Sequence, residues 1–242
     1  MRRRRTPLSA LARELALANR ILAREGVVDA YGHVSVRHPA DAARFLLSCS
    51  RSPELVTPKD IMQFDRAGEP TEAGEKRAPY LERYIHAAIY EARGDVMAVV
   101  HSHSAAVLPF AVAGAPLRPV IHTAGLTGAR IPLWDIGANF GETDMLVRNL
   151  EQGRDMARGL GACSALLMRG HGCTVAAADL REAVIAAIYL QLNAAVQLAA
   201  NGLGSLKYLS DGEIKLTAET NRLPNVKTLL WDYYVKRANA AF

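Results

Sequence analysis

Four stretches of the chain repeat apolar residues at the spacing of an α-helix. In the first stretch, leucine and isoleucine recur from Leu8 to Leu22, and Gly26 follows it as a stop. Apolar residues three and four positions apart lie on one face of a helix, so this spacing predicts amphipathic helices. The predicted helices cover residues 7–25, 80–93, 143–160 and 179–201, and the last of these is rich in alanine and leucine.

Shorter segments between these helices have the pattern of β-strands. Residues 31–37 alternate between polar and apolar side chains, and residues 96–100 form the continuous apolar run that is typical of a buried strand. A Pro at the first helical position predicts one capped turn over 57–61. The predicted strands cover residues 31–37, 44–48, 96–100, 119–122 and 164–168.

Helices and strands therefore mix along the whole chain, which predicts an α/β protein. The chain has 242 residues, of which 50% are hydrophobic, enough for one sizeable core and rather few for two. The sequence contains no internal repeat, low-complexity linker or break in composition. We therefore expect a single domain over residues 1–242.

The charge distribution limits the classes of partner. The formal net charge is +5, but the cationic residues concentrate at the ends, at positions 2–5 and around Lys236 and Arg237. A nearly balanced middle argues against a nucleic-acid groove and is compatible with a small anionic substrate.

The same residues bear on the compartment. We expect no apolar run of bilayer length, and the arginine-rich start has no apolar segment after it, so neither a membrane span nor a signal peptide is expected. The cysteines Cys49, Cys163 and Cys173 are an odd number without paired spacing, which suits a reducing compartment. We therefore expect a cytoplasmic protein.

The positions of the histidines indicate the chemistry. The apolar run 96–100 is followed by His101, Ser102 and His103, and side chains two residues apart on a strand point to the same side. His171 follows another apolar strand and has a glycine on each side, which permits a tight turn and a close approach of the backbone. Three neutral imidazoles with an open fourth position are a common catalytic zinc arrangement, and imidazole also binds manganese, iron, cobalt or nickel.

Taken alone, the pair of His101 and His103 is equally compatible with surface or core histidines. A lone helical histidine such as His86 is interpreted as a packing residue, and Cys173 as a small apolar filler rather than a ligand. His122 follows a predicted strand, and a position facing the pocket stays open for it.

Four motifs follow one another along the chain. They are Gly32-His33-Val34-Ser35-Val36-Arg37, Glu82-x-x-x-His86, Val99-Val100-His101-Ser102-His103 and Arg169-Gly170-His171-Gly172. In order and spacing they resemble the class II aldolase/adducin family, and the resemblance covers nearly the whole chain. The resemblance implies a three-layer α/β/α fold with a mixed, largely antiparallel central sheet. It also implies a homotetramer with active sites at the subunit interfaces.

Carried over position by position, the resemblance implies that His101, His103 and His171 are ligands of a divalent metal ion. Zinc or manganese is expected first, with iron or cobalt as alternatives. Glu82 becomes the carboxylate that either completes the metal shell or moves protons. The alternative within the family is a metal-free, adducin-like scaffold that keeps the shape alone.

Two loops differ from those with which the family's sugar-phosphate aldolases hold phosphate. One reads Ser48-Cys49-Ser50-Arg51-Ser52-Pro53-Glu54, and the other reads Ala78-Pro79-Tyr80-Leu81 in place of a pair of serines. Fewer hydroxyl donors and a new arginine favour a planar carboxylate, which guanidinium pairs through two parallel hydrogen bonds. Arg51 and Ser52 are therefore candidate substrate-binding residues, although a solvated loop charge explains Arg51 equally well.

These changes resemble the decarboxylase branch of the family, whose members act on hydroxylated aromatic dicarboxylates such as 3,4-dihydroxyphthalate and 3-hydroxy-2-methylpyridine-4,5-dicarboxylate. A carboxylate beside a ring hydroxyl can leave as CO2, and Glu82 or His33 would supply the proton that replaces it. Tyr234 is a candidate for substrate contact in a neighbouring subunit, with packing as the alternative. An aldolase acting on a sugar or hydroxy acid and a non-catalytic module are the other function classes.

Overall fold

The sheet at the centre of the fold is mixed and largely antiparallel. The computed structural model describes residues 7–239, so the arginines at positions 2–5 lie outside the described residues. Seven strands pair in the order β3-β2-β1-β4-β7-β6-β5, and only β5 and β6 are parallel. The strands are β1 His33–Arg37, β2 Phe45–Ser48, β3 Ile61–Phe64, β4 Ala98–Ser102, β5 Leu133–Trp134, β6 Ala165–Met168 and β7 Gly172–Ala177.

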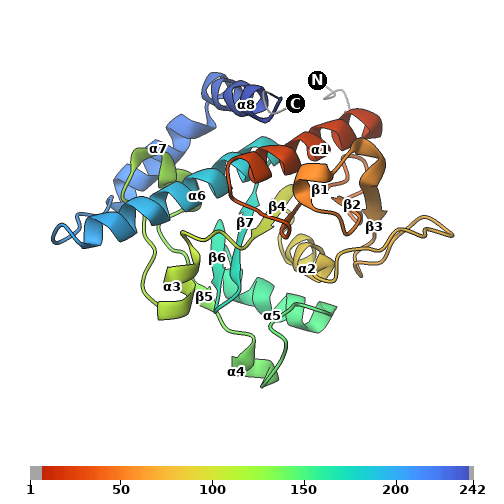
Figure 1. Ribbon diagram of the computed structural model, residues 1–242, viewed down its shortest axis with the longest axis horizontal. Coiled ribbons are helices and arrows are strands. Elements are labelled where there is room, and N and C mark those ends of the chain that lie inside the picture. Colours follow the sequence, from red (N-terminus) through yellow and green to blue (C-terminus); the bar gives the residue numbers. More distant parts are fainter. Residues whose placement is uncertain (1–6, 240–242) are drawn as a thin grey trace.

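Helices cover both faces of this sheet and complete three layers (Figure 1). One face packs against α1 Leu8–Arg24, α3 Leu108–Ala113, α6 Leu180–Asn201 and α8 Pro224–Asn239, and the other against α2 Arg83–Ala92 and α5 Leu150–Leu160. The remaining helices are η1 Pro53–Leu55, η2 Pro58–Asp60, η3 His122–Thr127, α4 Gly137–Phe140 and α7 Asp211–Arg222. The expected α/β/α fold is confirmed.

Alternation along the strands explains the two cores. On β4, Ala98 and Val100 join the core beneath α1 and α6, whereas Val99 joins the core beneath α2 and α5. Successive strand residues point to opposite faces, so a sheet covered on both sides needs apolar residues at every position. This requirement explains why residues 96–100 read as a continuous apolar run.

Two predicted elements are wrong. Residues 119–122 form no strand, because the amides of Arg118 and Val120 donate to the side chains of Gln197 and Asn193 on α6 instead of to a neighbouring strand. The helix predicted from residue 143 begins only at Leu150. Its predicted first turns are a loop in which Met145 adopts a left-handed backbone conformation, with φ of 67°.

Helix α6 also corrects the expectation that no apolar run reaches bilayer length. Among the described residues it is the one helix long and apolar enough to cross a membrane, by length and composition alone. However, its Gln191, Asn193 and Gln197 side chains form hydrogen bonds with other parts of the chain, and its apolar residues join the core. These contacts are typical of a core helix in a globular protein.

A buried carboxylate connects β5 to the helices beside it through hydrogen bonds. Asp155 of α5 accepts hydrogen bonds from the Trp134 indole at 2.8 Å, the Asn139 amide at 2.9 Å and the Arg158 guanidinium at 2.7 Å. Burial raises the pKa of the Asp155 carboxyl, but these three hydrogen bonds outweigh it and hold the pKa below its ordinary value. The charged carboxylate is therefore the form that the fold stabilises.

We expect the Asp155→Asn substitution to lower the free energy of unfolding at pH 7 by about 2 kcal/mol, because hydrogen bonds to a charged group are lost. Because the folded-state pKa is depressed, this difference is fully present above the unfolded-state pKa of about 3.9 and closes as the pH falls toward the folded-state pKa. Urea unfolding of both proteins between pH 7 and pH 3 measures it. Asp41→Asn, at an exposed ion pair with Arg44, serves as the control, and an equal loss in both variants would contradict the prediction.

Candidate metal centre

Two neighbouring strands bring three histidines to one edge of the sheet. His101 is near the end of β4, His103 follows this strand directly, and His171 lies in the turn that enters β7. Strand β4 pairs antiparallel with β7, with Ser102 opposite Cys173. This register places the end of β4 beside the beginning of β7, so residues 70 positions apart in the sequence approach one another.

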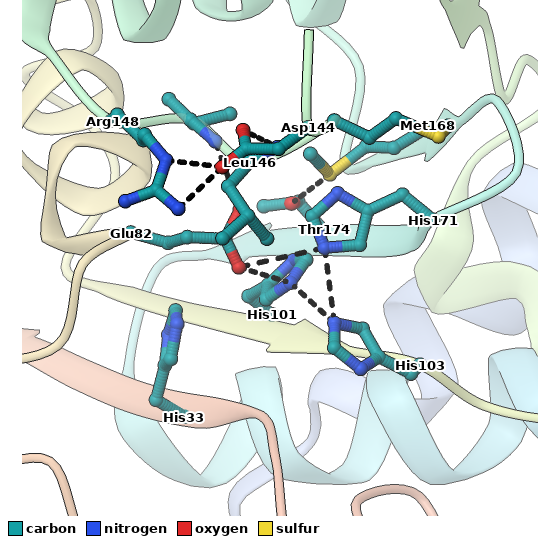
Figure 2. Close-up of polar contacts among 12 residues, drawn as sticks. His33, Glu82, His101, His103, Asp144, Leu146, Arg148, Met168, His171 and Thr174 are labelled. Atoms are coloured by element: carbon teal, nitrogen blue, oxygen red, sulfur yellow. Dashed lines mark hydrogen bonds and ion pairs between the residues drawn. The ribbon is translucent and has the colours of Figure 1, made fainter.

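The three imidazoles converge through the same ring atom. His103 Nε2 lies 3.1 Å from His101 Nε2 and 3.1 Å from His171 Nε2. Figure 2 shows these rings pointing toward a common centre together with the Glu82 carboxylate. The four potential ligand atoms all lie within 4.8 Å of one another.

A glycine permits this close approach. A Cβ atom on Gly172 would lie 2.2 Å from the carbonyl oxygen of Ser102 and 3.0 Å from the ring of His103. The contact with the carbonyl oxygen is shorter than a Cβ atom tolerates and the contact with the ring is tight, so a side chain at this position would force β4 and β7 apart. Gly172 therefore sets the spacing between His103 and His171.

Glu82 approaches the same centre from the face of the sheet that α2 and α5 cover. It precedes α2 directly, and its Oε2 lies 3.4 Å from His171 Nε2 and 3.6 Å from His101 Nε2. Its second oxygen accepts a hydrogen bond of 3.1 Å from the backbone amide of Val147. Burial raises the pKa of the Glu82 carboxyl, but the neighbouring His101 and His171 outweigh it and bring the pKa well below its ordinary range.

This donor set fits a divalent metal ion. Zinc binds imidazole nitrogen at about 2.0–2.1 Å in tetrahedral geometry, which requires nitrogen atoms about 3.3 Å apart, close to the spacings of 3.1 Å. Burial, and then the proximity of the His101 and His171 rings, lower the pKa of His103 to about 4, so its ring is neutral near pH 7 and has a nitrogen lone pair available. Three neutral imidazoles and one carboxylate are ligands that zinc, manganese, iron and cobalt accept.

His33 lies beside this cluster on β1. Its register partner on β4 is His101, and the centroids of the two rings are 5.0 Å apart. His33 is buried, and its Nδ1 lies 2.6 Å from Nε2 of the buried His86. His86 is therefore not one of the converging groups, in keeping with its interpretation as a residue outside the metal site.

A cavity of about 520 Å³ opens beside the cluster. Glu82, His33 and His103 contribute one part of its wall, and aromatic and aliphatic side chains contribute much of the rest. Its volume lies within the range of about 300–1,000 Å³ that is usual for small-molecule sites. The lining residues are Ala30, Tyr31, Gly32, His33, Ser50, Arg51, Ser52, Tyr80, Leu81, Glu82, His103 and Leu146.

The predicted substrate-binding residues separate into two groups. Arg51 and Ser52 line the cavity, whereas Tyr234 is buried in the core formed with α1 and α6 and is absent from the cavity wall. His122 is exposed at the start of η3 and is not among the cavity residues. Cys173 is buried, and burial raises the pKa of its thiol to about 11, which disfavours the thiolate that a metal would require.

Tyr31, Tyr80 and Leu146 line the cavity but were not among the residues predicted for the site. Tyr31 directly precedes the motif that begins at Gly32, and Tyr80 lies in the altered loop 78–81, two residues before Glu82, so their positions were a usable signal. Leu146 gave no such signal, because the segment that carries it was predicted to be helical. Its loop instead brings Leu146 to the cavity and the Val147 amide to Glu82.

Comparisons with known proteins agree with this architecture. The family model described as Class II Aldolase and Adducin N-terminal domain matches residues 13–198. The decarboxylase tropJ of Talaromyces stipitatus is 35% identical over 219 residues, covering 85% of this chain and 82% of the relative. The 3,4-dihydroxyphthalate decarboxylase of Arthrobacter keyseri is 31% identical over 247 residues, covering 96% of this chain and 95% of the relative.

A solved structure extends the similarity to the fold. The L-fuculose 1-phosphate aldolase from Glaciozyma antarctica superposes with a TM-score of 0.77 at 23% identity, covering 96% of this chain and 90% of the aldolase. The match of the family model over most of the chain, the two relatives above 30% identity and the shared fold have one explanation. The chain belongs to the class II aldolase/adducin family.

Proposed function

We propose that this protein is a metal-dependent decarboxylase that releases CO2 from a hydroxylated aromatic carboxylate. The observation that carries the proposal is the convergence of three imidazole nitrogens and one carboxylate beside a cavity whose wall includes Glu82, His103 and two tyrosines. The relatives from Talaromyces stipitatus and Arthrobacter keyseri are both named decarboxylases, and the second is named for 3,4-dihydroxyphthalate. Such a dicarboxylate, or a hydroxypyridine dicarboxylate, is the substrate class that we propose.

His101, His103 and His171 would hold the metal, with zinc or manganese as the first candidates and iron or cobalt as alternatives. When bound, the metal would act as a Lewis acid toward the negative charge that develops on the substrate oxygen. Glu82 would either complete the ligand set or act beside it. Its 3.4 Å and 3.6 Å separations from two of the imidazoles are compatible with both roles.

The cavity has suitable groups for an aromatic acid. The Tyr31 and Tyr80 side chains would lie against the ring, and Ser52 is a hydrogen-bond donor for a carboxylate. The described contacts of the Arg51 guanidinium involve Nε, which donates to Leu55 O at 2.8 Å and lies 3.6 Å from Asp60. Its two terminal nitrogens therefore remain as a fork for a substrate carboxylate.

We assign the proton movements to Glu82 and His33, which both lie on the cavity wall. Loss of CO2 becomes feasible in the keto form of the ring, in which the hydroxyl has given up its proton and the ring carbon that bears the carboxylate has taken one up. The Glu82 carboxylate is our proposed acceptor for the hydroxyl proton, and His33 is our proposed donor to the ring carbon. When the carbon–carbon bond then breaks, CO2 leaves and the bonding electrons return to the oxygen.

We also propose that the protein acts in the cytoplasm as a homotetramer with active sites at subunit interfaces. Several large apolar side chains of α7, α8 and the segment before α7 are exposed in the single chain, among them Leu216 at 64%, Leu229 at 69% and Leu203 at 90%. Burial of such residues between subunits would stabilise an assembly. Sedimentation of the purified protein measures the number of subunits.

We expect the His101→Ala substitution to remove bound metal and activity together. A missing ligand should lower the metal affinity by more than the ten- to hundredfold that loss of an outer contact costs. Metal content measured by mass spectrometry after dialysis, together with CO2 release, checks this. The control is His38→Ala, in a turn outside the cavity, and full metal retention by the His101 variant would rule out the proposed site.

The Glu82→Gln substitution separates proton transfer from metal binding. The amide keeps the size of the side chain but cannot take up a proton, so we expect kcat to fall by about 10² or more while some metal remains bound. Steady-state CO2 release and metal content are measured on the same sample. A variant with full turnover would show that Glu82 has no role in proton transfer.

The reaction class is tested with a panel of substrates. Metal-loaded protein should release CO2 from dihydroxyphthalates or hydroxypyridine dicarboxylates and no aldehyde from ketose phosphates or unphosphorylated sugars. Mass spectrometry of the products identifies the carboxylate that is lost. Aldehyde release without CO2 would favour the alternative function, a class II aldolase, and the absence of both products together with the absence of bound metal would favour a non-catalytic module.

A further inference from the structure

A row of four buried polar side chains leads away from the cavity wall. His33 Nδ1 lies 2.6 Å from His86 Nε2, and His86 Nδ1 lies 2.6 Å from Ser35 Oγ. Ser35 Oγ in turn lies 2.7 Å from the Tyr90 hydroxyl. All four residues are buried, with exposures between 0% and 7%. The row therefore runs through the interior of the protein from the cavity at His33 to Tyr90.

The secondary structure explains why these side chains meet. His33 and Ser35 are two residues apart on β1 and point to the same face of the sheet. His86 and Tyr90 are four residues apart on α2 and lie on the same face of the helix. Helix α2 packs against that face of the sheet, so the two pairs interlock as alternate members of one row.

Counting protons gives the direction of the hydrogen bonds. Burial raises the pKa of the Tyr90 hydroxyl, which therefore carries its proton, and its one side-chain partner among the described residues is Ser35. A buried hydroxyl that does not donate loses a hydrogen bond at a cost of about 1–3 kcal/mol. Tyr90 therefore donates to Ser35, and the Ser35 hydroxyl is left to donate to His86 Nδ1.

The same count continues to the cavity. Burial and the charge of His101 lower the pKa of His86 to about 3, so the ring is neutral and has one proton. Because Nδ1 accepts from Ser35, that proton lies on Nε2 and is donated to His33 Nδ1. A neutral His33 must then carry its own proton on Nε2, which has no hydrogen-bond partner within the described residues.

We propose that His86 is a positioning residue which, supported by Ser35 and Tyr90, fixes His33 as the tautomer that presents its Nε2–H to the cavity. The inference rests on the proposed decarboxylation, in which His33 gives a proton to the ring carbon. In this tautomer the Nε2–H faces the cavity, and the negative charge left on the His33 ring as that proton moves is offset by the proton that His86 Nε2 donates to His33 Nδ1. The opposite tautomer would present a lone pair to the cavity. Serine proteases illustrate the effect, since a wrongly held catalytic histidine lowers their kcat by about 10⁴.

Packing alone does not explain the row. Replacing buried hydrogen-bonded groups with apolar ones of the same shape is nearly neutral for stability, so a purely structural role would be served equally well by apolar side chains. The neighbouring core is built in this way, with Phe45 stacked on Phe64 at 5.3 Å. The directed row ends at the cavity, which is where a fixed tautomer has a chemical consequence.

The tautomer can be measured without substrate. Zinc-loaded protein labelled with ¹⁵N-histidine should give ring signals for His33 in which Nε2 is protonated and Nδ1 is not, and the His33→Asn variant assigns those signals. Protonation on Nδ1 alone would overturn the proposal. Because this measurement needs no turnover, failure to release CO2 would contradict the proposed function and leave the tautomer to be judged separately.

Substitution of His86 tests its role in holding the tautomer. In His86→Leu we expect a mixture of the two His33 tautomers and a fall in kcat of about tenfold or more, with KM unchanged. His86→Gln, whose amide N–H can donate to the same nitrogen, should restore the tautomer and most of kcat. Tyr84→Phe is the control, because this hydroxyl lies on the same helix but bonds to Glu69 and Arg83. A drop in kcat with an unchanged tautomer, or no rescue by glutamine, would overturn the proposal.

Discussion

The antiparallel pairing of β4 with β7 is the constraint on which the site depends. Its register places Ser102 opposite Cys173, so the histidines that follow β4 and precede β7 emerge side by side at one edge of the sheet. A backbone this close leaves no room for a Cβ at Gly172. On its other side β4 pairs with β1, and that register sets His33 opposite His101. A shift of one residue in either pairing would turn these side chains to the opposite face and dissolve the cluster.

Electrostatics then explains why this edge is chemically special. Three imidazoles and a carboxylate gather in a small space in which Glu82 and His101 are buried and His103 and His171 are half-buried, and polar groups without partners are costly there. Glu82 offsets part of that cost, because its charge is held between His101 and His171 and by the Val147 amide. A bound cation would offset more of it, since the converging Nε2 lone pairs and the Glu82 carboxylate would bind it directly.

Much of the fold and of the metal site could be predicted from the sequence, and the parts that could not be predicted have physical causes. His101 and His103 were recognised because an apolar strand before them fixes their direction, and α1, α2 and α6 because their periodicity is strong. Strand β7 was missed because its small residues, among them Cys173 and Thr174, are buried on both faces and give no alternation. The loop at Met145 could not be predicted either, since a left-handed conformation at a non-glycine residue depends on tertiary contacts. The row of polar side chains behind His33 could not be predicted from the sequence, because it depends on how α2 packs against β1.

Relatives that share this architecture have different names. The separation between the metal ligands and the other residues of the cavity bears on how this comes about. In an aldolase and in a decarboxylase of this fold, a bound metal would supply the same help, stabilisation of charge on a substrate oxygen. The two reactions must differ in the group that faces the substrate carbon of the carbon–carbon bond being broken. In our proposal His33 takes that place, and its ring contacts His86 of α2, which in turn contacts Ser35 of β1. Specificity for the reaction would then reside in the residues that face the metal across the cavity, while the metal ligands themselves stay common to both chemistries.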